Sequence, residues 1–317
     1  MENSINIVVK KNAQKRTAGA REKTEEAAEA LFAFCAAAAV LALVSVTVYL
    51  LFCGIPAIRE VGLMDILFGT VWDPTAREPK FGILLIVLTS LVGTLLAVAV
   101  GVPVGILTAV FLAEVAGPKT AWAVRGAVDV LAGIPSVIYG LVGIYLLNPL
   151  MYRVEMKLFA SSPAHRFTGG ANLLSAALVL AVMILPTVIS ISEASVRAVG
   201  PEIREASLAL GATRIQTIFR SVLPAARPGI ITAAVLGVGR AMGEAMAITL
   251  VSGGSINIPF PFRSVRFLTT AIVSEMGYAQ GLHRQMLFAV GLVLFVFILL
   301  INMAAEIIRK GYGERDG

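Results

Sequence analysis

Charged residues are scarce in this chain, and their scarcity restricts the class of protein it can be. Asp, Glu, Lys and Arg make up 15% of the 317 residues, whereas 57% are hydrophobic and the mean hydropathy is +0.85. Because soluble domains contain about 25% charged residues, this composition excludes an ordinary soluble domain. It indicates a protein that crosses a membrane several times, and the net charge of +6 is by itself no sign of nucleic-acid binding.

Cysteine and histidine are nearly absent, with two residues of each type. Cys35 and Cys53 lie in one apolar run, eighteen residues apart. That spacing is about 27 Å along a helix, so the two cannot form a disulfide with each other. His165 and His283 lie in different polar segments, and no zinc-ligand spacing occurs. We therefore expect neither a metal site nor a catalytic site in this chain.

The Gly-x-x-x-x-Gly-Lys-Ser/Thr motif of P-loop ATPases is also missing. The chain is therefore expected not to be an enzyme and to hold no cofactor of its own. What it does contain is six apolar runs, each long enough to cross a bilayer. They cover residues 31–52, 82–111, 124–147, 173–191, 229–251 and 285–308. In the third run, Pro135 beside Gly133 predicts a kink or unwound turn, where Ser136 can help to satisfy the freed carbonyls.

The distribution of Lys and Arg predicts the orientation of the chain. With both termini inside, the inside segments hold sixteen of these residues and the outside loops hold nine, and Arg240 is the one left over. Because positive residues favour the cytoplasmic side, we expect both termini in the cytoplasm. The chain then divides into a cytoplasmic tail (1–30), a first transmembrane helix with its outside loop (31–80), a transmembrane core (81–310) and a second cytoplasmic tail (311–317).

A polar segment with helix signals separates the fourth and fifth apolar runs. Pro201 suits the first position of a helix, and Gly211 can end that helix in the left-handed conformation. Thr213 can cap a second helix, which Pro224 and Pro228 are expected to end before the next span. The segment therefore favours a helix–Gly–helix unit on the cytoplasmic side, although an ordinary basic loop is the alternative.

The fifth run contains two ionisable residues, Arg240 and Glu244. A central arginine costs at least about 2.5–3.5 kcal/mol to place in a bilayer. Four residues apart on one helix, the two side chains would share a face and offset each other. They can form a buried pair that fixes packing, or line a path for a polar solute that approaches through glycines 237, 239 and 243. Arg125 and Asp129 have the same spacing, and we expect an interfacial salt bridge there.

The charges of the fifth run also suit a tetrahedral oxyanion. Arg240 can donate two parallel hydrogen bonds to such an anion, whereas the Glu244 carboxylate only accepts them. Phosphate at neutral pH keeps a P–OH group to donate and sulfate has none. Because a site that demands a donor rejects an analogue lacking it, we hypothesise that Glu244 selects phosphate over sulfate.

Residues 205–207 (Glu-Ala-Ser), Gly211 and residues 221–224 (Ser-Val-Leu-Pro) together resemble the EAA loop of ABC importer permeases. In that family the loop is a coupling helix that docks into a groove on the ATPase subunit. The resemblance implies that the ATPase-coupling residues are Glu205, Ala206, Gly211, Leu223 and Pro224. Two residues depart from the family pattern, since Ser207 stands where alanine is common and Ser221 where isoleucine is common.

Residues 132–140 and 236–249 are similar to motifs of phosphate-specific ABC importer permeases of the PstC type. The resemblance extends from about residue 81 to the C-terminus. It implies an all-α membrane protein with six transmembrane helices, arranged as a type I ABC importer bundle with a cytoplasmic coupling-helix loop. Arg240 and Glu244 match family positions associated with phosphate passage, and Ser136 lies in the first motif. These three residues are therefore the expected substrate path.

The resemblance also implies a set of partners in a bacterial cytoplasmic membrane. They are a second permease of the PstA type, two ATPase subunits that hydrolyse the ATP, and an external phosphate-binding protein. Closure of the ATPase dimer would switch the bundle between inward- and outward-facing states, so that phosphate crosses by alternating access. Three alternatives stay open: a PstA-type role, a permease for sulfate or molybdate, and an ion-coupled transporter without an ATPase.

Overall fold

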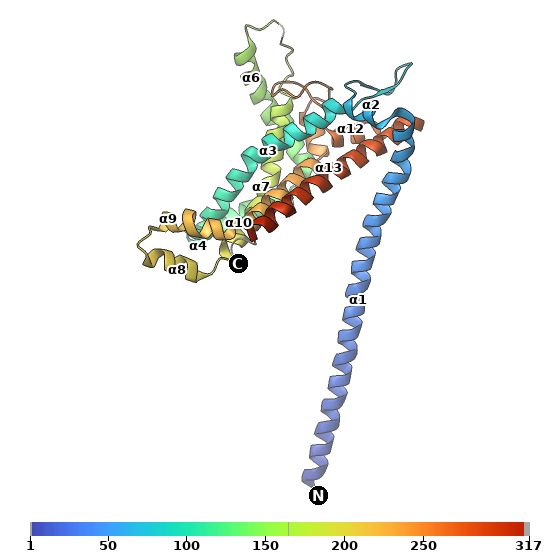
Figure 1. Ribbon diagram of the computed structural model, residues 1–317. Coiled ribbons are helices and arrows are strands. Elements are labelled where there is room, and N and C mark those ends of the chain that lie inside the picture. The colour runs from blue at the N-terminus through green and yellow to red at the C-terminus, as the bar shows by residue number, and fades with distance from the viewer. Residues whose placement is uncertain (1, 164, 314–317) are drawn as a thin grey trace. The chain divides into compact units, whose positions relative to one another are not determined.

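The computed structural model describes residues 2–163 and 165–313 (Figure 1). Met1 of the predicted N-terminal tail and residues 314–317 of the predicted C-terminal tail lie outside the described residues. The chain forms two compact units, Met1–Phe52 and Cys53–Gly317. The first unit is a single helix, and the second holds all the other elements.

The fold is almost entirely helical. The elements in chain order are α1 (Glu2–Val61), α2 (Leu63–Phe68), β1 (Trp72–Asp73), β2 (Lys80–Phe81), α3 (Leu84–Val110), the π-helical turn η1 (Phe111–Val115), α4 (Pro118–Gly133), α5 (Ser136–Val142), the π-helical turn η2 (Gly143–Leu147), α6 (Asn148–Phe159), α7 (Leu173–Arg197), α8 (Pro201–Ala209), α9 (Arg214–Thr217), the π-helical turn η3 (Ile218–Val222), α10 (Leu223–Gly243), α11 (Met246–Val251), α12 (Leu268–Glu275) and α13 (Gly281–Gly313). The two short strands pair antiparallel, with Trp72 opposite Phe81.

Six helical segments are long and apolar enough to cross a membrane, which confirms the predicted number among the described residues. They are Ala28–Val61, Leu84–Val115, Ser136–Phe159, Leu173–Arg197, Arg214–Gly243 and Gly281–Ala304. The second, fourth and sixth overlap the predicted runs closely. The third span starts and ends later than predicted, and the fifth starts and ends earlier. The starts differ because Pro135 breaks a helix, whereas Pro224 and Pro228 do not.

The first helix also ends later than predicted. The sequence predicted a loop from residue 54, but α1 continues through Gly54 and Pro56 to Val61. Its last turns belong to the second unit, where Ala57 is fully buried. Burial of this helix end compensates for the one backbone hydrogen bond that a proline removes. The helix stops at Gly62, which adopts a φ of 95°.

Pro135 breaks the third span completely instead of kinking it. The residue before a proline is pushed towards extended conformations, and Ile134 has a ψ of 125°. α4 therefore ends at Gly133 as a separate helix, and a new helical segment begins at Ser136. The span is Ser136–Phe159 and not 124–147 as predicted. It includes α6, which is the last part of the span.

Pro224 and Pro228, by contrast, do not end a helix, and that prediction was wrong. The helical segment runs without interruption over Arg214–Gly243. At η3 the backbone N–H of Leu223 bonds to Ile218 O, five residues back. This wider π-helical turn lies next to Pro224, which has no N–H to donate, and π-bulges accommodate such local irregularities. The segment instead ends at Gly243, where Glu244 turns to an extended ψ of 134° before α11 resumes the helix.

The core of the second unit forms around α7, which packs against α3 and α10. Leu180, Ile184 and Val188 are fully buried along α7. Two glycines of α3 allow a close approach to α7. A Cβ added at Gly101 would lie 2.8 Å from Ile184 and one at Gly105 would lie 2.6 Å from Val188. Small residues at such contacts let two helix backbones pack closely.

A buried carboxylate joins the elements at one end of the second unit. Glu275 is 4% exposed, and it accepts hydrogen bonds from Trp72 Nε1 at 3.0 Å and from Arg266, and pairs with His283 Nε2 at 2.8 Å. In Figure 1, α2, α6 and α12 lie at this end, while α4, α8 and α9 lie at the other. The short hairpin, the 252–267 connection and α13 are therefore held together by one side chain.

The packing of α3 on α7 makes a stability prediction. Gly101→Ala should lower the unfolding midpoint of the purified protein, at a cost of about 1–3 kcal/mol from overpacking. The added Cβ would meet Ala181 O at 2.9 Å as well as Ile184. Gly126→Ala on α4 is the matched control, because nothing lies within 4 Å of its added Cβ. Thermal unfolding followed by size-exclusion chromatography measures both, and equal midpoints would contradict the packing assignment.

Candidate functional site

The unit between the fourth and fifth spans, residues 201–222, forms a helix–turn–helix that we call the coupling unit. Pro201 occupies the first turn of α8, and Gly211 has a φ of 84°. Thr213 Oγ1 accepts from Gln216 N at 3.3 Å, while Gln216 Oε1 accepts from Thr213 N at 2.9 Å. This reciprocal capping box starts α9. The predicted helix start, left-handed turn and cap are therefore confirmed.

The coupling unit exposes an apolar surface. Leu210 is 90% exposed and Ile215 is 70% exposed, and a shallow pocket of about 440 Å³ lies beside Ile203 and Ala206. Exposed apolar surface of this kind marks sites of protein–protein contact. Of the predicted coupling residues, Glu205, Ala206 and Gly211 are exposed, whereas Leu223 and Pro224 are half-buried at the start of α10. The set is thus divided between the surface and the junction with the fifth span.

Three arginines attach the coupling unit and α7 to η1, at the end of α3. Arg204 of α8 donates to Glu114 Oε1 at 2.7 Å, and Arg214 of α9 donates to the Glu114 backbone carbonyl. Arg197 at the end of α7 donates to Leu112 O at 2.7 Å. The last carbonyls of a helix have no partner within it, so Arg214 and Arg197 satisfy two of them. The three contacts together fix the unit to the bundle. Sequence reasoning missed Glu114, because its partners are distant in the chain.

The two serines that depart from the family pattern contact each other. Ser221 Oγ donates to Ser207 Oγ at 3.3 Å, and Ser207 Oγ lies 3.0 Å from Thr217 Oγ1. α8 and η3 are therefore joined by hydroxyl groups on their inner faces. The two departures from the family pattern therefore form one local contact. The sequence alone does not show that these two positions meet.

The charged residues of the fifth span are not a helix-face pair, contrary to the prediction. Gly243 ends α10, so Glu244 lies beyond the helix that carries Arg240. Arg240 donates to Thr187 Oγ1 of α7 at 3.1 Å, and Glu244 Oε1 accepts from Ala247 N at 3.0 Å. No ion pair joins the two within the described part of the chain. Each charge is instead stabilised by a helix end, with the arginine at a C-terminus and the glutamate at an N-terminus.

The three glycines around Arg240 differ in what lies next to them. A Cβ at Gly237 would lie 3.0 Å from Val188, so this glycine serves packing. Nothing lies within 4 Å of a Cβ added at Gly239 or Gly243. The open surface predicted beside Arg240 is therefore present at these two positions.

The breaks in the third and fifth spans lie at the same end of two adjacent helices. α5 packs on α11, and a Cβ at Gly140 would lie 3.0 Å from Ala247 Cα while one at Gly143 would lie 2.4 Å from Val251. The two segments thus run parallel. Because Ser136 precedes Gly140 by one turn and Glu244 precedes Ala247 by about one turn, both residues lie where these helices begin.

Tyr139, not Ser136, satisfies a carbonyl freed by the break in the third span. Its hydroxyl donates to Leu131 O at 2.6 Å. Glu244 O at the other break accepts from Thr269 Oγ1 of α12 at 2.6 Å. Both breaks therefore have side-chain partners for their backbone groups, as interruptions inside a membrane require.

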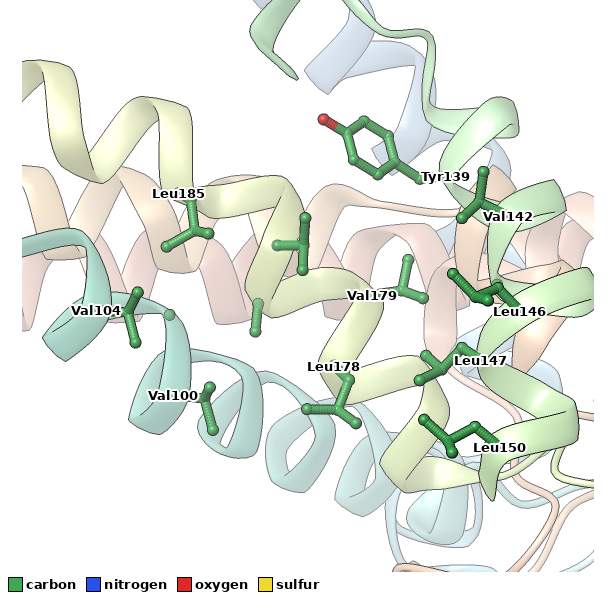
Figure 2. A pocket seen from close by; sticks show the side chains of 14 residues that line it. Val100, Val104, Tyr139, Val142, Leu146, Leu147, Leu150, Leu178, Val179 and Leu185 are labelled. Carbon is green, nitrogen blue, oxygen red and sulfur yellow. The ribbon is translucent and has the colours of Figure 1, made fainter. Parts of the chain in front are cut away.

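An apolar cavity of about 490 Å³ lies between α3, α7 and the third span. Figure 2 shows aliphatic side chains such as Val100, Val142 and Leu178 around it, with Tyr139 at one edge. The expected path residues are not part of its lining. Burial of an anion among aliphatic groups is costly, so this cavity does not suit an oxyanion.

The expected salt bridge between Arg125 and Asp129 was assigned to the wrong partner. Arg125 Nε donates to Glu193 of α7 at 2.9 Å, and Arg197 Nε donates to the same Oε1 at 2.8 Å. The hydrogen bond to Glu193 and its charge raise the pKa of Arg125, with a smaller contribution from Asp129. One carboxylate therefore joins α4 to α7, beside a polar cavity of about 400 Å³.

Comparison with known proteins identifies the family. Residues 101–313 match the family described as "Binding-protein-dependent transport system inner membrane component". The chain belongs to this family. It is 38% identical to the probable ABC transporter permease protein YqgH of Bacillus subtilis, over 84% of this chain and 86% of that protein. It is 31% identical to the phosphate transport system permease protein PstC of Xylella fastidiosa, over 95% and 96%.

The fold agrees with this assignment. The chain is similar to a chain of a bacterial alginate ABC transporter crystallised with a periplasmic protein bound to an alginate pentasaccharide. The TM-score is 0.55, with 19% identity over 78% of this chain and 83% of that chain. The protein is thus a membrane-spanning ABC importer permease with the type I bundle, a transport subunit whose family works with ATPase and substrate-binding partners.

The contacts of Glu114 predict how firmly the coupling unit is held. Glu114→Gln should speed amide hydrogen exchange in α8 by about tenfold, because Arg204 loses a charge-assisted hydrogen bond that holds the helix to η1. Hydrogen exchange followed by mass spectrometry of peptides from residues 201–222 measures the effect. Glu202→Gln, an exposed residue of the same helix, is the control. Identical exchange in wild type and Glu114→Gln would rule out the attachment.

Proposed function

We propose that this chain is the PstC-type permease subunit of an ATP-driven importer of inorganic phosphate. Permeases named for phosphate transport are 31–33% identical to it in Xylella fastidiosa and Mesorhizobium japonicum. The more similar YqgH is named only as a probable ABC permease. The choice of phosphate as the substrate therefore also needs support from the chemistry of Arg240 and Glu244.

One observation carries the mechanism: a single helix joins the coupling unit to Arg240. The segment Arg214–Gly243 has 30 residues, which is about 45 Å of continuous helix. It begins in the coupling unit and ends one turn after Arg240. A displacement of α9 by an ATPase subunit is then transmitted along a rigid element to the turn that holds the guanidinium.

The attachment of η1 supplies a second connection. Arg204 and Arg214 link the coupling unit to Glu114, and Arg197 links the same turn to α7. A movement of the coupling unit therefore displaces α3 and α7 together with α10. Such rigid-body movement of packed helices is the usual way in which closure at one site opens another.

Arg240 is suited to meet the anion. Its guanidinium has five N–H donors, of which the described residues engage one, through Thr187. The side chain is exposed in the isolated subunit, so the remaining donors face the space next to the bundle. Arginine forms bidentate hydrogen bonds with phosphate oxygens. A charge that is not neutralised by Glu244 remains available to the substrate.

Glu244 is suited to select the anion. One carboxylate oxygen accepts from Ala247 N, and the other can accept a P–OH hydrogen. Separation of Glu244 from Arg240 favours a role in the path over a structural ion pair, because a packing pair needs contact between the two groups. Ser136 lies where the adjacent helix begins, so its hydroxyl is a further polar group for the path.

The partners and orientation follow from this function. The second permease is of the PstA type, two ATPase subunits bind the exposed face of the coupling unit, and a phosphate-binding protein delivers the anion from outside. ATP is hydrolysed by the partner subunits. Both termini and the coupling unit then lie in the cytoplasm of a bacterium, and the chain resides in its inner membrane.

Substitution of Arg240 tests its role in the path. Arg240→Gln should abolish ATP-dependent uptake of radiolabelled phosphate in proteoliposomes that contain the assembled transporter, because the anion loses its charged partner. ATP hydrolysis and assembly are measured alongside, and Arg284→Gln on α13 is the matched control. Full uptake by an assembled Arg240→Gln transporter would make the residue structural. Uptake of sulfate or molybdate but not phosphate by the wild type would identify a different oxyanion importer.

Substitution of Glu244 tests the basis of selectivity. Glu244→Gln keeps an oxygen that can accept from Ala247 N, so the local fold should persist. The amide adds an N–H donor for sulfate and removes a negative charge, so inhibition of phosphate uptake by sulfate should strengthen by about tenfold. Glu78→Gln in the exposed hairpin is the control. Unchanged competition by sulfate in Glu244→Gln would contradict the hypothesis that Glu244 selects phosphate over sulfate.

A further inference from the structure

A polar pocket lies at the end of the second unit opposite to the coupling unit. It has a volume of about 330 Å³ and lies between the segment 165–168, which follows α6, and the segment 255–264, which follows α11. Both segments belong to the end of the bundle where α6 and α12 lie (Figure 1). None of the expected path residues lines this pocket.

The lining of this pocket is positively charged. Arg166 and Arg263 lie in its two opposite segments, and both are exposed. Within the described residues Arg166 has no hydrogen bond or ion pair. Arg263 places its guanidinium carbon 6.0 Å from the centre of the Phe260 ring. A cation over a ring face keeps its N–H donors free at the edge. Two guanidinium groups are therefore available to a ligand.

The carboxylate of Glu155, which contacts two lining residues, does not neutralise these charges. Glu155 is fully buried behind the pocket. One of its oxygens accepts from Thr168 N at 3.0 Å and lies 2.8 Å from His165 Nε2, and the other accepts from Thr168 Oγ1 at 3.0 Å. Both oxygens are thus engaged in holding the wall of the pocket. No Asp or Glu is part of the lining.

Both walls are held in place before any ligand arrives. The backbone carbonyl of Arg263 accepts from Leu173 N at 3.0 Å, at the start of α7. Asn257 Nδ2 donates to Ser264 O at 2.9 Å, and Ser264 Oγ accepts from Ser255 N at 3.2 Å. His165 stacks on Phe159 with ring centres 4.0 Å apart. A preorganised site loses little conformational entropy when it binds.

We propose that this pocket binds a phosphate group between Arg166 and Arg263. Paired guanidinium groups are the preferred protein partners of phosphate oxygens, and the hydroxyls of Ser255 and Ser264 supply further polar contacts. The group can belong to free inorganic phosphate or to an anionic lipid headgroup, since both present charged phosphate oxygens. The proposal stands on the pocket alone and does not depend on the role of Arg240.

The test measures binding of inorganic phosphate to the full-length chain in phospholipid-free detergent. Arg240→Gln is the background, so that the expected path does not contribute. Saturable binding seen by calorimetry should weaken by about tenfold in Arg166→Gln and in Arg263→Gln, because each variant loses a charge-assisted hydrogen bond. Arg153→Gln, an exposed residue of α6 outside the pocket, is the matched control and should bind as the background does.

A second arm separates the two sources of the phosphate group. The chain is placed in nanodiscs of phosphatidylglycerol, and the lipids it retains are counted by native mass spectrometry. Free phosphate as the ligand predicts binding in detergent. A lipid headgroup predicts no such binding but one retained phosphatidylglycerol, which is lost in Arg166→Gln and Arg263→Gln. If neither ligand binds, or if Arg153→Gln weakens binding equally, the proposal is overturned.

Discussion

Backbone groups inside a membrane have no water to bond to, so each interruption of a helix needs a partner from within the protein. The two interruptions near Arg240 obey this constraint through Tyr139, which donates to Leu131 O, and Thr269, which donates to Glu244 O. Glu244 itself accepts from Ala247 N. The breaks are therefore stable features, and the polar groups they expose are held in position.

The same constraint explains why the fifth span stays continuous at Pro224, where the sequence predicted that the helix would end. Pro224 follows a π-helical turn in which Leu223 bonds five residues back, so the helix absorbs the missing donor. The second helix of the coupling unit and Arg240 consequently belong to one continuous helical segment, Arg214–Gly243. Glu114 and its arginines attach this element to α3, while Glu275 joins the elements at the other end of the bundle. These two carboxylates therefore hold neighbouring elements together at the two ends of the bundle.

Much of the fold could be predicted from local signals. Six apolar runs, Pro201, Gly211 and Thr213 depend on span length, helix starts and turn conformation, which neighbouring residues decide. The site was harder to predict from the sequence. The spacing of four residues places Arg240 and Glu244 in contact only if the helix continues between them. Gly243 ended it, and Thr187 became the partner of Arg240. Arg125 likewise pairs with Glu193, 68 residues away, and not with its near neighbour Asp129.

The sequence by itself determined that this chain crosses a membrane six times and carries a helix–Gly–helix unit, because hydropathy and backbone conformation are properties of short segments. Tertiary structure alone decided which charges meet, which proline breaks a helix and which does not, and that Ser207 and Ser221 form one contact. The physical reason is that partners for a buried polar group come from whichever element packs beside it. Only the folded bundle brings those elements together.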